Sequence, residues 1–175
     1  RKKIRPKKEI KKILVFFGSY DSTNETLKLM SKVSKFKNVK FYIIISKINK
    51  NYVKNNFLLS KISNTKLIKN PTNEKFLEVV TQCDISIGAG GVSLLERLAL
   101  GLPSIVIGTA DNQQNSINYL NKKKLIYYLG DKSNVNYEIL NKLLNDLIKN
   151  KKKFKDFSLK TFSFFKNKDL SLLSK

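Results

Sequence analysis

Histidine is absent from the 175 residues of this chain, and cysteine occurs once, as Cys83. Without histidine the chain lacks the commonest general base and the commonest metal ligand of proteins. A single cysteine excludes an internal disulfide and is typical of a reducing cytoplasm, where we expect the protein to act. Cys83 ends a predicted helix, which favours a buried apolar role over catalysis. We therefore predict no catalytic residue, no metal site and no cofactor in this chain.

Long apolar runs are also missing. No run approaches the roughly 18 residues that a membrane-spanning helix needs, and no signal peptide opens the chain. A hydrophobic fraction of 41% fits a soluble globular protein about the size of one large domain. The chain begins at Arg1 rather than at a methionine, which indicates a piece of a longer protein.

Acidic residues and arginine are scarce. The chain contains 13 Asp and Glu and 35 Lys and Arg, which gives a formal charge of +22. Such a charge would attract polyanions such as nucleic acid or acidic membranes. Only Arg1, Arg5 and Arg97 are arginines, whereas specific nucleic-acid sites usually rely on arginine. The lysines are spread along the chain, as a bias toward A/T-rich codons would produce. This pattern favours a solvated Lys-rich surface without a nucleic-acid site, and a polyanion-binding module is the alternative.

Short apolar runs alternate with helical patterns six times along the chain. The predicted strands cover 13–17, 39–45, 66–68, 85–87, 104–107 and 126–129. The predicted helices cover 26–36, 50–62, 73–82, 92–100, 113–121 and 137–149. This alternation predicts an α/β fold, a mostly parallel sheet with helices on both faces. Right-handed crossovers make it a doubly wound, Rossmann-like sheet with strand order 3-2-1-4-5-6.

The composition divides the chain into three expected segments. Residues 1–12 form a basic linker, residues 13–150 the Rossmann-like domain, and residues 151–175 a helical tail rich in Lys and Phe. The phenylalanines of the tail need an apolar surface, either on this domain or on a neighbouring one. In the first turn, Ser22 or Thr23 is the expected N-cap of the following helix.

A glycine turn follows the fourth predicted strand and leads into a helix. In an open parallel sheet, ligands bind beyond the carboxyl ends of the strands, where the strand order switches. That switch is expected between strands one and four, at Gly18-Ser19 and at residues 88–93. Free amides and the positive dipole end at a helix start bind anions well. We therefore predict a diphosphate site made of Gly88, Ala89, Gly90, Gly91, Val92 and Ser93.

Two other interpretations of the glycine turn stay open. A Gly-x-Gly-x-x-Gly dinucleotide motif fails at Ser93 and would normally follow the first strand, although Asp111 lies where a ribose-binding acid would be expected. The glycines can also serve only the tight packing of a strand against a helix.

Two polar features near the turn are candidate ligand contacts. Glu96, one turn into the helix, can accept both hydroxyls of a ribose, but Ser93 to Glu96 also fits a capping box. After the fifth strand, Asn112 and Gln113 lie at the same sheet edge and suit the hydroxyl or acetamido groups of a sugar. A simple turn and helix start explains these amides equally well.

The run from Asp84 to Ile107, followed by Asn112-Gln113, resembles the UDP-sugar hydrolases of the pseudaminic acid pathway. The shared features are Gly-Ala-Gly-Gly, Glu-Arg, Gly-Leu-Pro and Asn-Gln at matching spacing. That family and the lipid II synthase glycosyltransferases share the GT-B arrangement of two Rossmann-like domains, with UDP bound mainly by the second. The resemblance is strongest over residues 84–113 and extends back to Ile13.

The resemblance implies a role for each matching position. The amides of Gly90, Gly91 and their neighbours would hold the UDP diphosphate, and Glu96 the ribose. Asn112 and Gln113 would lie near the sugar, and Gly18-Ser19 would match the first glycine loop. The resemblance also implies that the catalytic base is a histidine of an N-terminal domain, which we expect as a partner in cis or in trans.

The leading hypothesis is therefore the nucleotide-binding half of a UDP-sugar hydrolase. Such an enzyme releases UDP from a UDP-activated acetamido deoxy sugar in nonulosonic (pseudaminic) acid biosynthesis. The alternative within the same fold is half of a UDP-sugar-dependent glycosyltransferase. A basic module that binds nucleic acid or acidic membrane is the third hypothesis.

Overall fold

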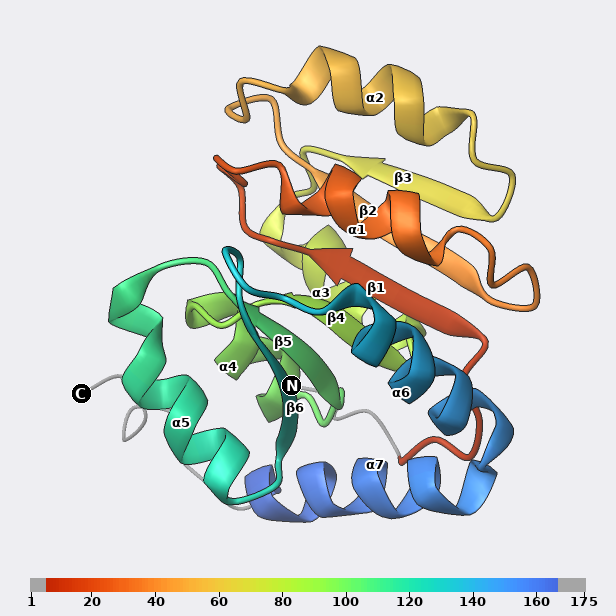
Figure 1. Cartoon of the computed structure of the whole chain (residues 1–175), viewed down its shortest axis with the longest axis vertical. Helices are drawn as coiled ribbons and strands as arrows, with labels where there is room; N and C mark the ends of the chain where they lie inside the picture. The colour runs from red at the N-terminus through yellow and green to blue at the C-terminus, as the bar shows by residue number, and fades with distance from the viewer. Residues whose placement is uncertain (1–5, 167–175) are drawn as a thin grey trace.

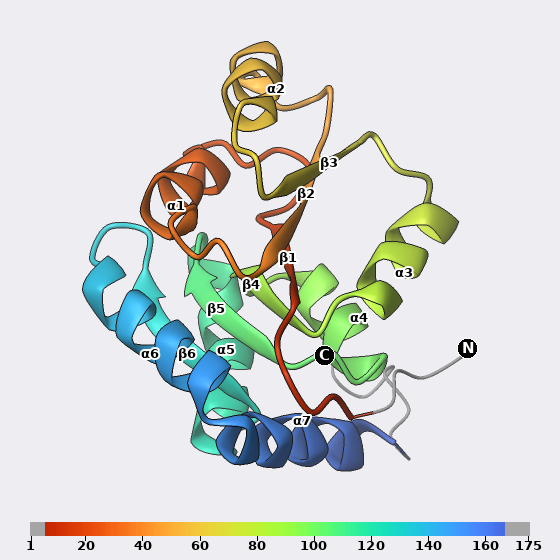
Figure 2. The same ribbon diagram turned by 90° about the vertical axis from the view of Figure 1, so that its right-hand side faces the viewer.

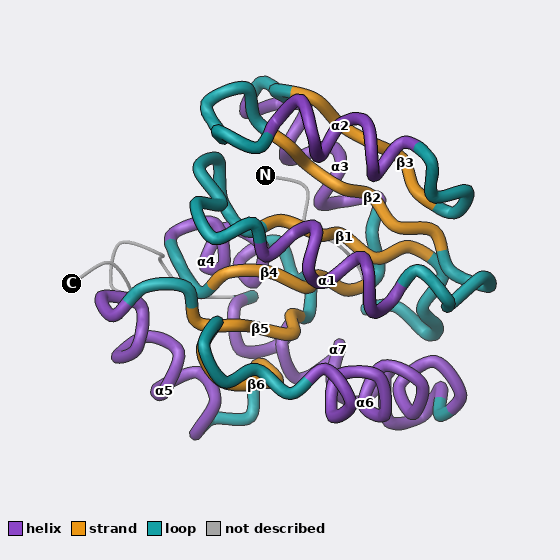
Figure 3. The backbone as a smooth tube through the Cα atoms, turned by 45° about the horizontal axis from the view of Figure 1, so that its top comes forward, coloured by secondary structure: helices purple, strands orange, loops and turns teal. Residues whose placement is uncertain are grey.

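The computed structural model describes residues 6–166, which form one six-stranded sheet covered by helices. The strands are β1 (Lys12–Phe16), β2 (Lys40–Ile45), β3 (Thr65–Lys69), β4 (Ile85–Ala89), β5 (Ser104–Gly108) and β6 (Ile126–Asp131). All neighbouring strands are parallel, in the order β3-β2-β1-β4-β5-β6 (Figure 3). This confirms the predicted fold class and strand order.

Helices cover both faces of the sheet (Figures 1 and 2). One face carries α1 (Glu25–Val33), α2 (Tyr52–Ser60) and α6 (Tyr137–Lys149). The opposite face carries α3 (Asn73–Gln82), α4 (Val92–Ala99) and α5 (Gln114–Lys122). Each βαβ unit returns its strand to the same sheet, so every β-to-α turn lies at one edge, the carboxyl edge.

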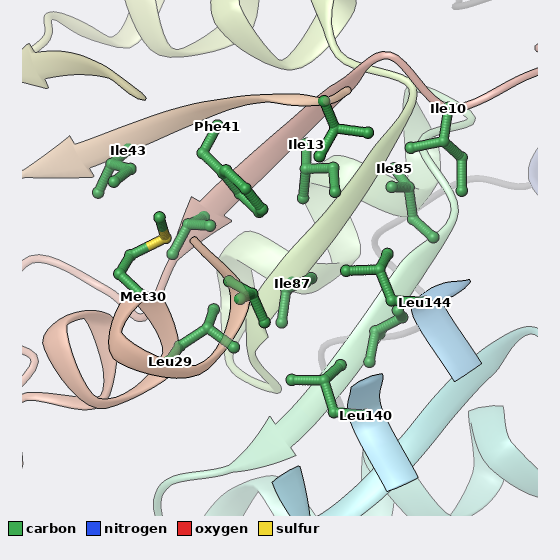
Figure 4. Packing of buried hydrophobic residues seen from close by; sticks show 14 of the residues in the cluster. Ile10, Ile13, Leu29, Met30, Phe41, Ile43, Ile85, Ile87, Leu140 and Leu144 are labelled. Carbon is green, nitrogen blue, oxygen red and sulfur yellow. The ribbon is translucent and has the colours of Figure 1, made fainter. Parts of the chain in front are cut away.

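Continuous apolar runs make up the central strands because both of their faces are covered. Ile13, Ile85 and Ile87 point toward α1 and α6, where they meet Leu29 and Leu140 (Figure 4). On the other face, Leu14 and Phe16 of β1 pack in one cluster with α3, and Val106 of β5 packs with α4 and α5. The core therefore holds β1 and β4 rigidly side by side, and their carboxyl ends form the switch point.

The helix α7 (Lys151–Phe165) closes the amino edge of the sheet (Figures 1 and 2). Its buried Phe154 and Phe157 join the cluster beneath α1 and α6, whereas Phe165 joins the cluster around α4 and α5. The phenylalanines in the described part of this helix therefore pack on this domain.

Asp84 fixes the segment that leads into β1. Its carboxylate accepts hydrogen bonds from the amides of Lys11 at 2.9 Å and Lys12 at 2.8 Å. The amide of Lys7 donates to Ser158 Oγ of α7 at 3.1 Å. The residues just before β1 therefore lie against the body of the domain.

The start of α1 differs from the predicted N-cap at Ser22 or Thr23. The N-cap is Asn24, in the left-handed region at φ 59°, and its side chain makes no capping bond. The buried carboxylate of Asp21 instead accepts from the amides of Glu25 at 2.8 Å and Thr26 at 3.1 Å. An ionised carboxylate is a stronger acceptor than a hydroxyl and also complements the helix dipole, so Asp21 takes the capping role.

Candidate functional site

A pocket of about 540 Å³ opens at the carboxyl edge, between the ends of β1 and β4. It joins the two loops that the switch-point rule selects, Gly18-Ser19 after β1 and the turn that leads into α4. Its lining is Phe16, Phe17, Gly18, Ser19, Ile44, Ser46, Asn70, Pro71, Thr72, Asn73, Phe76, Ala89, Gly91, Val92, Ser93, Glu96 and Gln113. Three other residues predicted as ligand contacts do not line this pocket: Gly88, Gly90 and Asn112.

The positions of the turn require glycine for different physical reasons. A Cβ on Gly88 would collide with the carbonyl oxygen of Phe16, and a Cβ on Gly90 would collide with the side chain of Ile117. At Gly91 the nearest atom to an added Cβ is Gln113 Nε2, at an ordinary 3.5 Å. Tight packing therefore explains Gly88 and Gly90, and Gly91 is the glycine that faces the pocket.

The first turn of α4 presents backbone amides toward the pocket. The N-cap is Gly91, and no side chain caps this helix end. The hydrogen bonds within residues 6–166 leave the amides of Val92 and Ser93 without a protein acceptor. The capping-box interpretation is therefore wrong, because Ser93 lies inside the helix rather than at its N-cap. An anion at the mouth of this helix would meet free donors and the positive dipole end.

Glu96 lines the pocket with a partly exposed side chain, one turn after the open amides. The described residues offer it no ion pair or side-chain hydrogen bond. Both oxygens of the carboxylate are therefore available to accept hydrogen bonds from hydroxyl groups of a ligand.

Gln113 joins the turn before α4 to the loop after β5. Its Oε1 accepts from the amide of Gly90 at 3.3 Å and from the amide of Thr109 at 3.2 Å. Its Nε2 lies near Gly91, with the donor hydrogens left for a ligand. Asn112 and Asp111 are exposed in the short 3₁₀ helix Asp111–Gln113 and do not line the pocket. Asp111 therefore lends no support to the dinucleotide interpretation.

The β1–α1 loop forms the opposite rim. Gly18 has φ +89°, a left-handed conformation that glycine adopts without strain. Ser19 follows as an exposed hydroxyl, and the next side chain, Tyr20, is 71% exposed. Across the pocket, Val92 is 77% exposed at the start of α4. Val92 thus lies exposed on the lining of the pocket, and Tyr20 is exposed on the loop beside it.

The far wall of the pocket comes from residues that sequence reasoning missed. Ser46 follows β2, and the segment Asn70–Asn73 follows β3, with Phe16 and Phe76 forming an apolar floor. Phe16 and Phe76 pack with ring centroids 5.3 Å apart. The sequence could have indicated these residues. They follow the second and third predicted strands, and so lie at the same carboxyl edge as the loops after strands one and four.

Arg97 is the second feature that sequence reasoning missed. Its side chain is fully buried behind the glycine turn, with hydrogen bonds to Ser86 Oγ at 3.0 Å, Ala89 O at 2.7 Å and Ser93 O at 3.1 Å. Burial lowers the pKa of the guanidinium to about 10, so it stays cationic at neutral pH. Arginine is scarce in this chain, with only three among the 35 basic residues, and this scarcity could have marked Arg97 as a residue with a specific role.

Lysines gather at the other end of the sheet. Lys124, Lys152, Lys153 and Lys160 line a hollow of about 420 Å³ together with Tyr127 and Phe157. This hollow lies where β6 begins, on the amino edge, and thus away from the pocket. Within residues 6–166 no cluster of three potential metal-ligating side chains was found, and no helix there is long and apolar enough to cross a membrane.

Fold and pocket together define a Rossmann-like domain with its crevice at the switch point between β1 and β4. The chain belongs to the family described as the glycosyltransferase family 28 C-terminal domain, whose model matches residues 12–171. No curated protein matches the chain significantly.

Solved structures resemble this domain in fold at low sequence identity. MurG of Acinetobacter baumannii is 16% identical with a TM-score of 0.69, over 97% of this chain and 50% of MurG. Os79 of O. sativa, solved in complex with UDP, is 15% identical with a TM-score of 0.66, over 94% of this chain and 36% of Os79. The spinosyn rhamnosyltransferase SpnG with thymidine diphosphate is 16% identical with a TM-score of 0.64, over 94% and 43%. The chain thus spans half or less of these proteins.

Proposed function

We propose that this domain binds the UDP moiety of a nucleotide sugar and forms half of a two-domain enzyme. The observation that carries the proposal is that open helix amides and the unpaired carboxylate of Glu96 line one pocket at the switch point. Family membership and the nucleoside diphosphates bound to Os79 and SpnG support it.

The diphosphate would lie against the turn at Gly91 and the amides of Val92 and Ser93. These groups combine unused donors with the amino end of α4, and anionic oxygens satisfy both. Gly91 adds no side chain between the backbone and the ligand. Gln113 Nε2 is a further donor on the same side of the pocket.

The nucleoside would extend from the turn toward the far wall. Glu96 would accept hydrogen bonds from the ribose hydroxyls, since its carboxylate is one helical turn from the open amides. A flat base needs an apolar surface and polar groups at its edge. Phe16 and Phe76 provide the apolar surface, and the segment Asn70–Asn73 provides the polar groups.

A partner domain, in cis or in trans, would complete the site. The chain spans 50% or less of the similar solved proteins, and its family model describes a C-terminal domain. Val92 lines the pocket and Tyr20 follows the lining residue Ser19, and a second domain docked over the pocket would bury both exposed side chains. By the resemblance to the UDP-sugar hydrolases, a histidine of that domain would be the general base that activates the attacking group.

In the reaction we propose, the bond between the anomeric carbon of the sugar and the UDP oxygen breaks, and UDP leaves with the bonding electrons. Donors aimed at the diphosphate would stabilise this charge as it develops. The resemblance of residues 84–113 to UDP-sugar hydrolases of the pseudaminic acid pathway supports water as the attacking group. The family match supports the second candidate, transfer of the sugar to an acceptor.

Calorimetric titration of the chain with UDP and with NAD tests the proposed site. UDP should bind and NAD should not, because the pocket lacks a dinucleotide motif. The complete protein should then release UDP from a UDP-activated amino sugar. Release in water alone identifies a hydrolase, and release that depends on an acceptor identifies a transferase. A folded chain that prefers NAD, or that binds neither nucleotide, would show the proposal to be wrong.

A further inference from the structure

Arg97 holds the glycine turn from behind. Its Nη2 donates to Ala89 O at 2.7 Å, and its Nε donates to Ser93 O at 3.1 Å. Ala89 and Ser93 also line the pocket. The guanidinium therefore lies one layer behind the pocket and connects the last residue of β4 to the first turn of α4.

Arg97 forms no direct ion pair with a described residue, and the charge of Glu96, which raises the pKa of Arg97, only partly offsets the cost of burial. All three acceptors of its hydrogen bonds are neutral, the third being Ser86 Oγ at 3.0 Å. None of the ion pairs found within residues 6–166 includes Arg97. Burying a cation without a direct ion pair is unfavourable, so buried charges are normally paired. Ala89 and Ser93, whose carbonyl groups bind Arg97, both line the pocket, so an anion bound there would add a second counter-charge close behind the turn.

The residue type matters as much as the charge. Lysine fills 32 of the 35 basic positions in the chain, and Arg97 is the only arginine within the described residues. A planar guanidinium reaches three acceptors in fixed directions, whereas an ammonium is a compact point charge. Gly88 leaves the room this requires, because an added Cβ there would lie 3.0 Å from Arg97 Nη1.

We propose that Arg97 is a positioning residue that holds the Ala89–Ser93 turn in shape and supplies a positive potential selecting ligands with a diphosphate group. The inference rests on the proposed function, since it assigns the diphosphate of UDP as a counter-charge additional to Glu96. Electrostatic attraction through protein is far less screened than attraction to surface lysines. The effect of Arg97 should therefore grow with the negative charge of the ligand.

A ligand series of increasing charge tests this inference. The chain, Arg97→Met and Arg97→Lys would be titrated with uridine, UMP, UDP and inorganic pyrophosphate. Arg97→Met should lower the affinity for UDP and for pyrophosphate by about tenfold or more. It should lower the affinity for UMP by a smaller factor, and the affinity for uridine by less than about twofold. Arg97→Lys should fall between Arg97→Met and the parent chain. Lys47→Met, which removes an exposed cation near the pocket, should change every affinity by less than about twofold.

The outcomes separate this inference from the proposed function. An equal loss of uridine and UDP affinity in Arg97→Met, or no loss at all, would overturn the role of Arg97. A parent chain that binds pyrophosphate in an Arg97-dependent way but shows no preference for UDP would refute the proposed function alone. Binding of no anion by the folded parent chain would refute both.

A second measurement covers the case in which Arg97→Met does not fold. A buried ammonium loses its proton more readily than a guanidinium. As the pH rises above neutrality, the UDP affinity of Arg97→Lys should therefore fall at lower pH than that of the parent chain. Identical pH profiles for the parent chain and the folded Arg97→Lys variant would overturn the inference.

Discussion

The side-chain oxygen of Gln113 accepts a 3.3 Å hydrogen bond from the backbone amide of Gly90. The same oxygen also accepts from the amide and the hydroxyl of Thr109. One glutamine thus joins two loops that are separated by the whole of α4 and β5. Its amide nitrogen faces the pocket, so its orientation is fixed before any ligand arrives.

Replacing Gln113 by glutamate should weaken UDP binding by at least about tenfold, because an anion then takes the place of a donor beside the diphosphate. Calorimetry with UDP measures the effect. The matched control is Asn112→Asp, which adds the same charge at an exposed neighbour outside the pocket and should cost less than about threefold. Similar losses for both variants would mean that Gln113 has no specific role.

Gly90→Ala should destabilise the fold, because its new methyl group collides with the side chain of Ile117. Overpacking of this kind typically costs about 1–3 kcal/mol, measurable by urea unfolding. Adding Ile117→Val should restore part of the loss by making room. If Gly90→Ala is as stable as the parent chain, the packing explanation of this glycine is wrong.

Gly91→Ala should behave in the opposite way. An added Cβ lies 3.5 Å from Gln113 Nε2, so stability should change by less than about 1 kcal/mol. UDP affinity should fall by about fivefold or more, because the methyl group occupies the approach of the diphosphate to the backbone. Unchanged UDP affinity in this variant would place the diphosphate elsewhere.

Glu96→Gln should reduce the preference for ribonucleotides. If the carboxylate accepts from the ribose hydroxyls, the variant loses about tenfold in UDP affinity and much less in 2′-deoxy-UDP affinity. Titration of both nucleotides against both proteins forms a double-mutant cycle. Equal losses for the two nucleotides would contradict contact with the 2′-hydroxyl.

Cys83 should report on the integrity of the fold. Burial raises the pKa of its thiol from the ordinary value of 9.0 to about 12. The unfolded chain therefore loses this proton at a lower pH than the folded chain, and stability falls as the pH rises from 9.0 toward about 12. Urea unfolding at increasing pH should show a shallower decline in Cys83→Val. An identical decline in both proteins would contradict the buried neutral thiol.

The lysine hollow at the amino edge predicts how the charge-based alternative would behave. Any binding of single-stranded DNA or acidic vesicles should be lost as salt rises, because exposed lysines act through screened charge. Such binding should fall in a Lys152→Glu, Lys153→Glu double variant and should tolerate Glu96→Gln. DNA binding that resists salt and needs Glu96 would support a nucleic-acid function at the pocket instead.

Much of the fold was predictable because local patterns and topological rules agreed. The apolar run beginning at Ile13 requires a strand buried on both faces, and right-handed crossovers leave few strand orders. The helices 73–82 and 137–149 were predicted with the bounds that the structure has. The cap of α1 was missed, because the choice of Asp21 depends on its burial and not only on its position.

The candidate site was predictable only in outline. Spacing selected the turn before α4 and the carboxyl edge, and the structure places Gly18, Ser19 and Glu96 around one pocket there. Spacing could not show that Gly91 faces the pocket whereas Gly88 and Gly90 pack against other residues, because this difference depends on tertiary contacts. It also gave Ser93 and Glu96 a capping box that the actual helix start, at Gly91, excludes.

The sequence by itself determined the alternation of strands and helices, the parallel sheet and the glycine turn at its switch point. These follow from hydrophobic periodicity and from glycine positions, which act over a few neighbouring residues. Only the tertiary structure decided that Gln113 joins two loops, that Phe16 and Phe76 form the floor of the pocket, and that Arg97 is buried behind the turn without a direct ion pair among the described residues. These relationships depend on atoms brought together from distant strands, because burial and hydrogen-bond partners are properties of the packed molecule and not of its local pattern.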